Sequence, residues 1–114
     1  MTENTSWHAR AAEIKIDGRA FINGERAWAR SGQTFDNLSP IDGRLLGQVA
    51  RCDGADVEAA VQAARAAFDD RRWAGKSPAQ RKRILIKFAD LVQKYGPELA
   101  LLETLDMGKP IKYS

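Results

Sequence analysis

The chain has 114 residues, 44% hydrophobic and 29% charged, which is the size and composition of one small globular domain and not of a fibrous or disordered chain. Its net charge of +3 is small and dispersed, so composition gives no reason to expect a nucleic-acid or membrane partner. The first residues lack the basic and apolar regions of a signal peptide, and no apolar run is long enough to cross a bilayer. We therefore expect a cytoplasmic protein.

The pattern of residues in the N-terminal part of the chain predicts short strands. Residues 1–12 are polar and aperiodic apart from Trp7, and we expect a flexible lead or a short helical start there. Residues 14–16 alternate with the period of a strand. Asn23-Gly24 follows a short apolar run and is typical of a type I′ turn, whose two central residues need a positive φ. The sequence predicts a β-hairpin at this turn.

A second strand pair is predicted from residues 33–38 and 45–50. The connection contains Pro40, which fixes one backbone dihedral, and Gly43, which supplies a permissive one. Cys52 follows the second of these strands and is the only cysteine, so the chain cannot form an internal disulfide or a thiolate metal cage. We interpret Cys52 as a small, buried or half-buried apolar residue.

From Asp53 onward the periodicity becomes helical, and three helices are expected before residue 108. Asp53 and Asp56 resemble a capping pair before an alanine-rich apolar stripe. Ser77 and Gln80 form a capping box with Pro78 at the first helical position. The apolar residues expected on the buried face of this second helix are Ile84, Leu85, Phe88, Leu91, Val92 and Tyr95. A third helix from Pro97 should end at Gly108.

Strands followed by helices, with no parallel strand pair joined by a crossover helix, predict an α+β piece rather than a complete βαβ fold. The sequence also lacks the Gly-x-Gly-x-x-Gly turn that lets backbone N–H groups bind a pyrophosphate. It has no His and Cys pattern with metal-binding spacing, because His8 and Cys52 are the only residues of these types. A self-contained hydrolase, kinase or zinc enzyme is therefore disfavoured.

Two segments leave alternatives open. Residues 71–83 hold six cations and Trp73, which could suit phosphate contacts, but a solvated helix start with Trp73 in the core is the favoured reading. Asp106, near a helix C-terminus, would ordinarily be held by Lys109 or a backbone N–H. The alternative is that Asp106 binds a hard cation together with carbonyl oxygens of the strand end at Asn37 and Leu38.

Several segments, in this order and spacing, resemble the NAD(P)-dependent aldehyde dehydrogenase superfamily. The final one is the octad Glu-Thr-Leu-Asp-Met-Gly-Lys-Pro at residues 103–110. Within the family, the head around Trp7 and the run 99–104 look most like the γ-glutamyl-γ-aminobutyraldehyde dehydrogenases of bacterial putrescine breakdown. The other matching segments are Phe21-Ile22-Asn23-Gly24-Glu25, residues 34–40, residues 56–68, Trp73, and Ser77-Pro78-Ala79-Gln80-Arg81.

The resemblance implies that residues 13–114 are the N-terminal part of the cofactor-binding domain of an α/β enzyme, with strands in 13–52 and helices in 53–108. Such enzymes oxidise an aldehyde to an acid with NAD or NADP, using a cysteine nucleophile and a glutamate base. The resemblance places those two residues and the nucleotide fingerprint beyond Ser114. The chain alone is therefore expected to be inactive, to bind no cofactor and to expose apolar helix faces.

Family members also carry a structural Na+ or K+ near the aspartate of the octad, and this maps to Asp106 with the backbone at Asn37 and Leu38. Expected partners are the remainder of the polypeptide, other subunits of a homo-oligomer and a small aldehyde, with no nucleic acid and no membrane. An alternative function is a stand-alone interaction module derived from such an enzyme, which would bind a partner through an exposed apolar patch.

Overall fold

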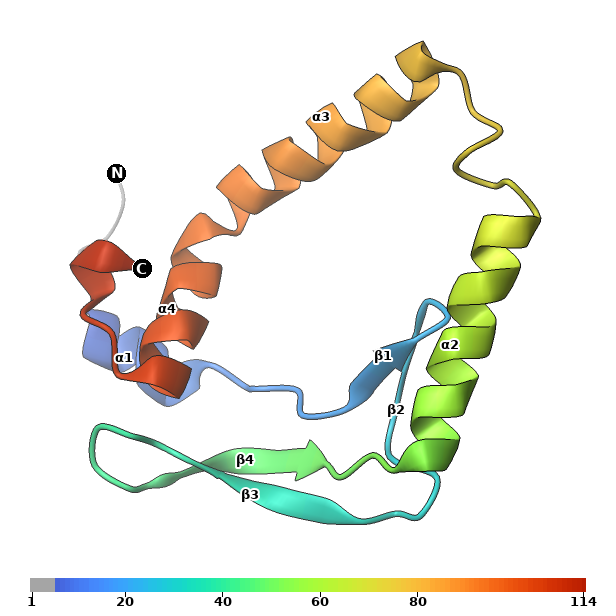
Figure 1. The fold of residues 1–114 in the computed structure, drawn as a ribbon. Helices are drawn as coiled ribbons and strands as arrows, with labels where there is room; N and C mark the ends of the chain where they lie inside the picture. Colours follow the sequence, from blue (N-terminus) through green and yellow to red (C-terminus); the bar gives the residue numbers. More distant parts are fainter. Residues whose placement is uncertain (1–5) are drawn as a thin grey trace.

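The computed structural model describes residues 6–114 and contains two small antiparallel sheets and four α-helices (Figure 1). This is the small α+β arrangement that the sequence predicted. The elements are α1 (Trp7–Glu13), β1 (Ala20–Ile22), β2 (Glu25–Ala27), β3 (Thr34–Leu38), β4 (Leu45–Ala50), α2 (Gly54–Asp69), α3 (Pro78–Lys94), α4 (Gly96–Met107) and the 3-10 turn η1 (Ile111–Tyr113).

The first described segment is helical. Ser6 caps α1 by accepting a hydrogen bond from the N–H of Ala9, at 3.1 Å. The helical alternative for this segment therefore holds for residues 7–13, and residues 1–5 lie outside the described part. The strand expected at residues 14–16 is wrong, because this segment is not part of either sheet. Two residues further on, the carbonyl of Gly18 accepts a hydrogen bond from the N–H of Ala50 in β4, at 2.7 Å.

Both predicted hairpins are confirmed. β1 and β2 pair with Ile22 opposite Glu25, and Asn23 and Gly24 have φ values of 55° and 78°, as a type I′ turn requires. β3 and β4 pair with Phe35 opposite Val49, with an irregularity between Asn37 and Leu38. The two sheets are separate, so neither hairpin extends the other.

The three predicted helices are also confirmed, and their caps explain where they begin and end. Asp53 and Asp56 form a capping box at the start of α2, and Ser77 and Gln80 form one at the start of α3. α4 ends at Gly108, whose φ of 73° is left-handed and favours glycine. Local sequence signals thus determine all three boundaries.

The core within the described residues is small. Leu101 and Leu105 of α4 are 5% and 4% exposed, and Ala29 and Ala50 are the other buried apolar residues. The predicted burial of Trp73 is wrong, because its side chain is 42% exposed. The six apolar residues expected on the buried face of α3 are exposed as well. None of the described residues covers that face, so the periodicity of α3 marks an apolar surface that is left open in this part of the chain.

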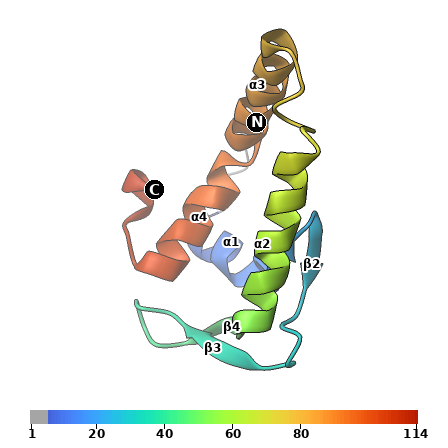
Figure 2. The ribbon, with the colours of Figure 1, turned by 45° about the vertical axis from the view of Figure 1, so that its right-hand side comes forward.

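The chain forms an open, thin ring rather than a compact body. In Figure 1, α2 lies beside β1 and β2, whereas α3 stands apart from both sheets and meets α2 only through their connection. Figure 2 shows the same arrangement from another side. The molecule measures 45 × 41 × 20 Å, and its radius of gyration is 17.8 Å. A compact chain of this length has a radius of gyration of about 13 Å. The fold therefore encloses space that its own side chains do not fill.

Candidate functional site

The structure brings two of the three predicted cation-site residues together. Asn37 lies near the end of β3 and Asp106 near the end of α4, and the Asn37 side-chain amide donates a hydrogen bond to Asp106 Oδ1 at 3.1 Å. Leu38 is the last residue of β3, beside the irregularity in the strand pairing. Residues 69 positions apart in the sequence thus meet at this point.

The surroundings of Asp106 differ from the simpler expectation. Lys109 was expected to hold Asp106, but its Nζ lies 3.2 Å from Glu103 Oε1 instead. Gly108 turns the chain back against the β3–β4 connection, where a side chain at this position would meet Pro40. The side chain of Asp106 is hydrogen-bonded to Asn37 of β3, and that of Lys109 is bonded to Glu103.

The structure places the Asp106 carboxylate, with its single negative charge, against the side-chain amide of Asn37 at this junction. One carboxylate and backbone carbonyls suit a hard cation of low charge. Among residues 6–114, no group of three or more His, Cys, Asp or Glu side chains could hold a metal ion. The assignment of Na+ or K+ to this junction stays a prediction.

Within residues 6–114, the starts of α2 and α3 are poor sites for a dinucleotide pyrophosphate. A helix N-terminus binds an anion through free N–H groups. At the start of α2, these groups are already bound by the Asp53 and Asp56 carboxylates, which would also repel a phosphate. At the start of α3, Ser77 and Gln80 satisfy them. Together with the missing glycine fingerprint, this means that neither of these two helix starts fits the pyrophosphate of NAD or NADP.

Asp56 has a second role that the sequence did not reveal. Its side chain is buried, and Oδ1 accepts a hydrogen bond from the backbone N–H of Arg30 at 3.0 Å, while Oδ2 accepts one from Asp53. The bond from the Arg30 N–H is the first cause that lowers the pKa of Asp56 below its ordinary value, followed by the bond from Asp53. Asp56 therefore ties α2 to the loop before β3. The capping pattern identified the residue but not its partner 26 positions away.

The predicted burial of Cys52 is wrong, since the residue is exposed just after β4. Its position after the last residue of the strand places it outside the ladder, on the short link to α2.

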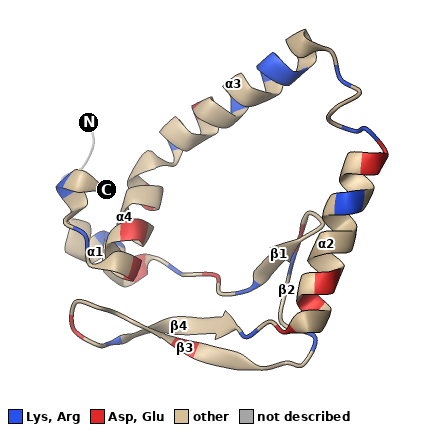
Figure 3. Cartoon of the chain, viewed as in Figure 1, with Lys and Arg blue, Asp and Glu red and all other residues tan. Residues whose placement is uncertain are grey.

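The basic segment 71–83 is a solvated corner. Figure 3 shows Lys and Arg on the α2–α3 connection and the first turns of α3. One of these cations is engaged locally: Arg72 pairs with Asp70 at 2.6 Å, and the Arg72 side chain lowers the pKa of Asp70.

No helix of the described part is both long and apolar enough to span a membrane.

Comparison with known proteins decides the family. The model of the aldehyde dehydrogenase family matches residues 28–114. The chain belongs to this family. Among curated relatives, the NADP/NAD-dependent aldehyde dehydrogenase PuuC of Escherichia coli (strain K12) is 44% identical over 95% of this chain and 22% of its own length. The aminoacetaldehyde dehydrogenase of Pseudomonas aeruginosa is 46% identical over 98% of this chain and 23% of its length.

Solved structures of whole enzymes share this fold. The P. syringae indole-3-acetaldehyde dehydrogenase, in complex with NAD+ and IAA, is 58% identical with a TM-score of 0.89, over 92% of this chain and 21% of its own. The γ-glutamyl-γ-aminobutyraldehyde dehydrogenase of Burkholderia cenocepacia J2315 is 55% identical with a TM-score of 0.90, over the same shares. The chain thus spans about a fifth of the length of the relatives that it matches.

Proposed function

We propose that this chain is the N-terminal portion of a cytoplasmic, homo-oligomeric enzyme that oxidises an aminoaldehyde to a carboxylic acid with NAD+ or NADP+. The observation that carries the proposal is the match of nearly the whole chain to about a fifth of aldehyde dehydrogenases, two of them named for aminoaldehydes. The open ring supports it, because a part of a larger enzyme leaves surfaces that the remainder covers.

The chain by itself should not turn over an aldehyde. The sequence has no Gly-x-Gly-x-x-Gly turn for the dinucleotide, and we expect that its single cysteine is not the nucleophile. Rate acceleration needs both a bound cofactor and an activated thiolate. Purified chain mixed with NAD+ and γ-glutamyl-γ-aminobutyraldehyde should give no NADH absorbance above the rate without protein. Steady NADH production from this polypeptide would overturn the prediction.

The parent enzyme is tested by reading the source DNA past the codon for Ser114. We expect a continuing frame with a nucleotide-binding strand, turn and helix and a later Cys and Glu. The enzyme expressed from that frame should prefer γ-glutamyl-γ-aminobutyraldehyde or aminoacetaldehyde over indole-3-acetaldehyde in kcat/KM. An immediate stop codon would instead favour the interaction module, which predicts a monodisperse, folded 114-residue protein.

The junction of β3 and α4 gives the proposal a second part, a bound Na+ or K+ held by Asp106 and by carbonyl oxygens of Asn37 and Leu38. An Asp106→Asn variant of the parent enzyme keeps a partner for the Asn37 amide but loses the charge that attracts the cation. The gain in Tm on replacing choline chloride with NaCl or KCl should disappear in this variant. An equal gain in the wild type and the variant would contradict the cation site.

A further inference from the structure

The described chain exposes more surface than a compact protein of its mass. Its accessible area is 9061 Å². A compact protein of this mass exposes about 6,200 Å². The excess is several times the roughly 800 Å² that each partner buries in a standard interface. A surface of this extent is typical of a piece that becomes part of a larger folded body.

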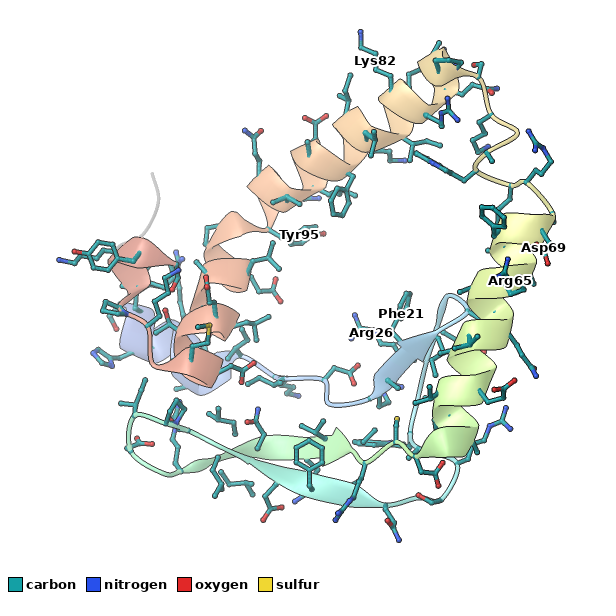
Figure 4. All side chains as sticks on the ribbon, in the orientation of Figure 1. Phe21, Arg26, Arg65, Asp69, Lys82 and Tyr95 are labelled. Carbon is teal, nitrogen blue, oxygen red and sulfur yellow. The ribbon has the colours of Figure 1, made fainter. Side chains whose placement is uncertain are left out.

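The excess surface includes an apolar face on the inner side of the ring. In Figure 4, Tyr95 at the end of α3 and Phe21 of β1 both point into the space that the ring encloses. Residues 4, 7 and 11 positions before Tyr95 share its helix face because of the helical period. Phe21 and Phe88 are 69% and 64% exposed. We call the following set the inner face: Phe21, Ile84, Phe88, Leu91 and Tyr95.

The opposite side of α3 has a different character. Lys82 points away from the ring in Figure 4. Ile86 and Gln93 lie on the same side as Lys82, four and eleven positions further along the helix. We call these three residues the outer face. A helix with aromatic and aliphatic side chains on one side and mixed side chains on the other is built to be covered on one side only.

The shape of the ring indicates what covers the inner face. The chain superimposes on whole aldehyde dehydrogenases with TM-scores of 0.89 and 0.90 while matching about a fifth of their length. The open shape is therefore the one that the corresponding segment has inside a complete enzyme. If a second copy of this chain covered the inner face, the match between the ring and the corresponding segment of a complete enzyme would have no explanation.

We propose that the inner face is the docking surface for the body of an aldehyde dehydrogenase polypeptide, and that the outer face of α3 stays exposed to solvent in the assembled enzyme. The proposal rests on the proposed function for the identity of the occupant. It goes further in naming the side of α3 that is buried and the side chains that make the contact.

A chimeric enzyme tests the proposal. Residues 1–114 replace the corresponding segment of the P. syringae indole-3-acetaldehyde dehydrogenase, and the product is assayed for soluble yield and for NADH formation from indole-3-acetaldehyde. The unmodified chimera should be soluble and active. Phe88→Asp should lower the yield of active enzyme by at least about tenfold, because it buries an unpaired carboxylate. Ile86→Asp, the matched control on the outer face, should leave the yield nearly unchanged.

A second measurement keeps the proposal testable even where a variant fails to fold. Leu91→Cys and Gln93→Cys chimeras are treated with a maleimide, and labelling at each site is mapped by mass spectrometry. Leu91→Cys should be protected in the native enzyme and become reactive on denaturation, whereas Gln93→Cys should react in both states. Equal labelling of the two sites, equal effects of the two Asp variants or an insoluble unmodified chimera would overturn the proposal. Substrate preference is measured in the natural enzyme, so these outcomes leave that part of the proposed function untouched.

Discussion

Gly18→Val should cost the chimeric enzyme much of its stability, and Gly18→Ala nearly as much. A Cβ at this position would lie 2.8 Å from both the carbonyl carbon of Gln48 and the Cα of Val49, closer than side chains approach backbone. The backbone of β4 and the segment at Gly18 cannot move apart without a loss of stability, because the N–H of Ala50 donates a hydrogen bond to the carbonyl of Gly18 at 2.7 Å. We expect a loss of about 3 kcal/mol for the valine variant.

The matched control for Gly18 is Gly54→Ala. Gly54 opens α2, and a Cβ there meets nothing within 4 Å. Alanine has a higher helix propensity than glycine, so this variant should be neutral or slightly more stable. Thermal unfolding of the two alanine variants provides the comparison. If Gly18→Ala unfolds at the temperature of the unmodified chimera, the close approach to β4 is not what requires glycine here.

Asp56→Asn should lower the Tm of the chimeric enzyme by several degrees at neutral pH. The carboxylate accepts the N–H groups of Arg30 and Asp53, whereas an amide can accept through one atom only and turns a donor towards the other N–H. Asp69→Asn, on the exposed end of the same helix, is the control, because the nearest atoms of Asp69 and Arg65 are 3.8 Å apart in a solvated pair.

The effect of Asp56 should depend on pH with a definite sign. Its pKa is lower in the folded state than its ordinary value of 3.8, so its stabilisation is fully present above that value and is lost as the pH falls through the folded-state pKa. The Tm difference between the unmodified chimera and Asp56→Asn should therefore shrink below about pH 4. A difference that stays constant down to low pH would mean that the charged form of Asp56 contributes nothing.

The turns and helix ends could be predicted from the sequence because the interactions that form them join near neighbours in the chain. The Asn23-Gly24 turn, the capping boxes at Asp53 and Ser77 and the glycine at position 108 each act over a few residues. Strand pairing was readable where a short turn fixes the register, as in both hairpins. The strand predicted from the alternation at residues 14–16 was wrong, because an alternating segment becomes a strand only when it pairs with another strand, and residues 6–114 supply no such partner there.

The sequence by itself determined the family, the four strands and the three main helices, since turn chemistry, caps and periodicity act between near neighbours. Only the tertiary structure decided that Asn37 meets Asp106, that Asp56 holds the loop at Arg30 and that Gly18 lies against β4. It also decided which apolar residues are buried. A helix pattern identifies an apolar face, but its burial depends on the partner that packs there, and for α3 that partner is not among these residues.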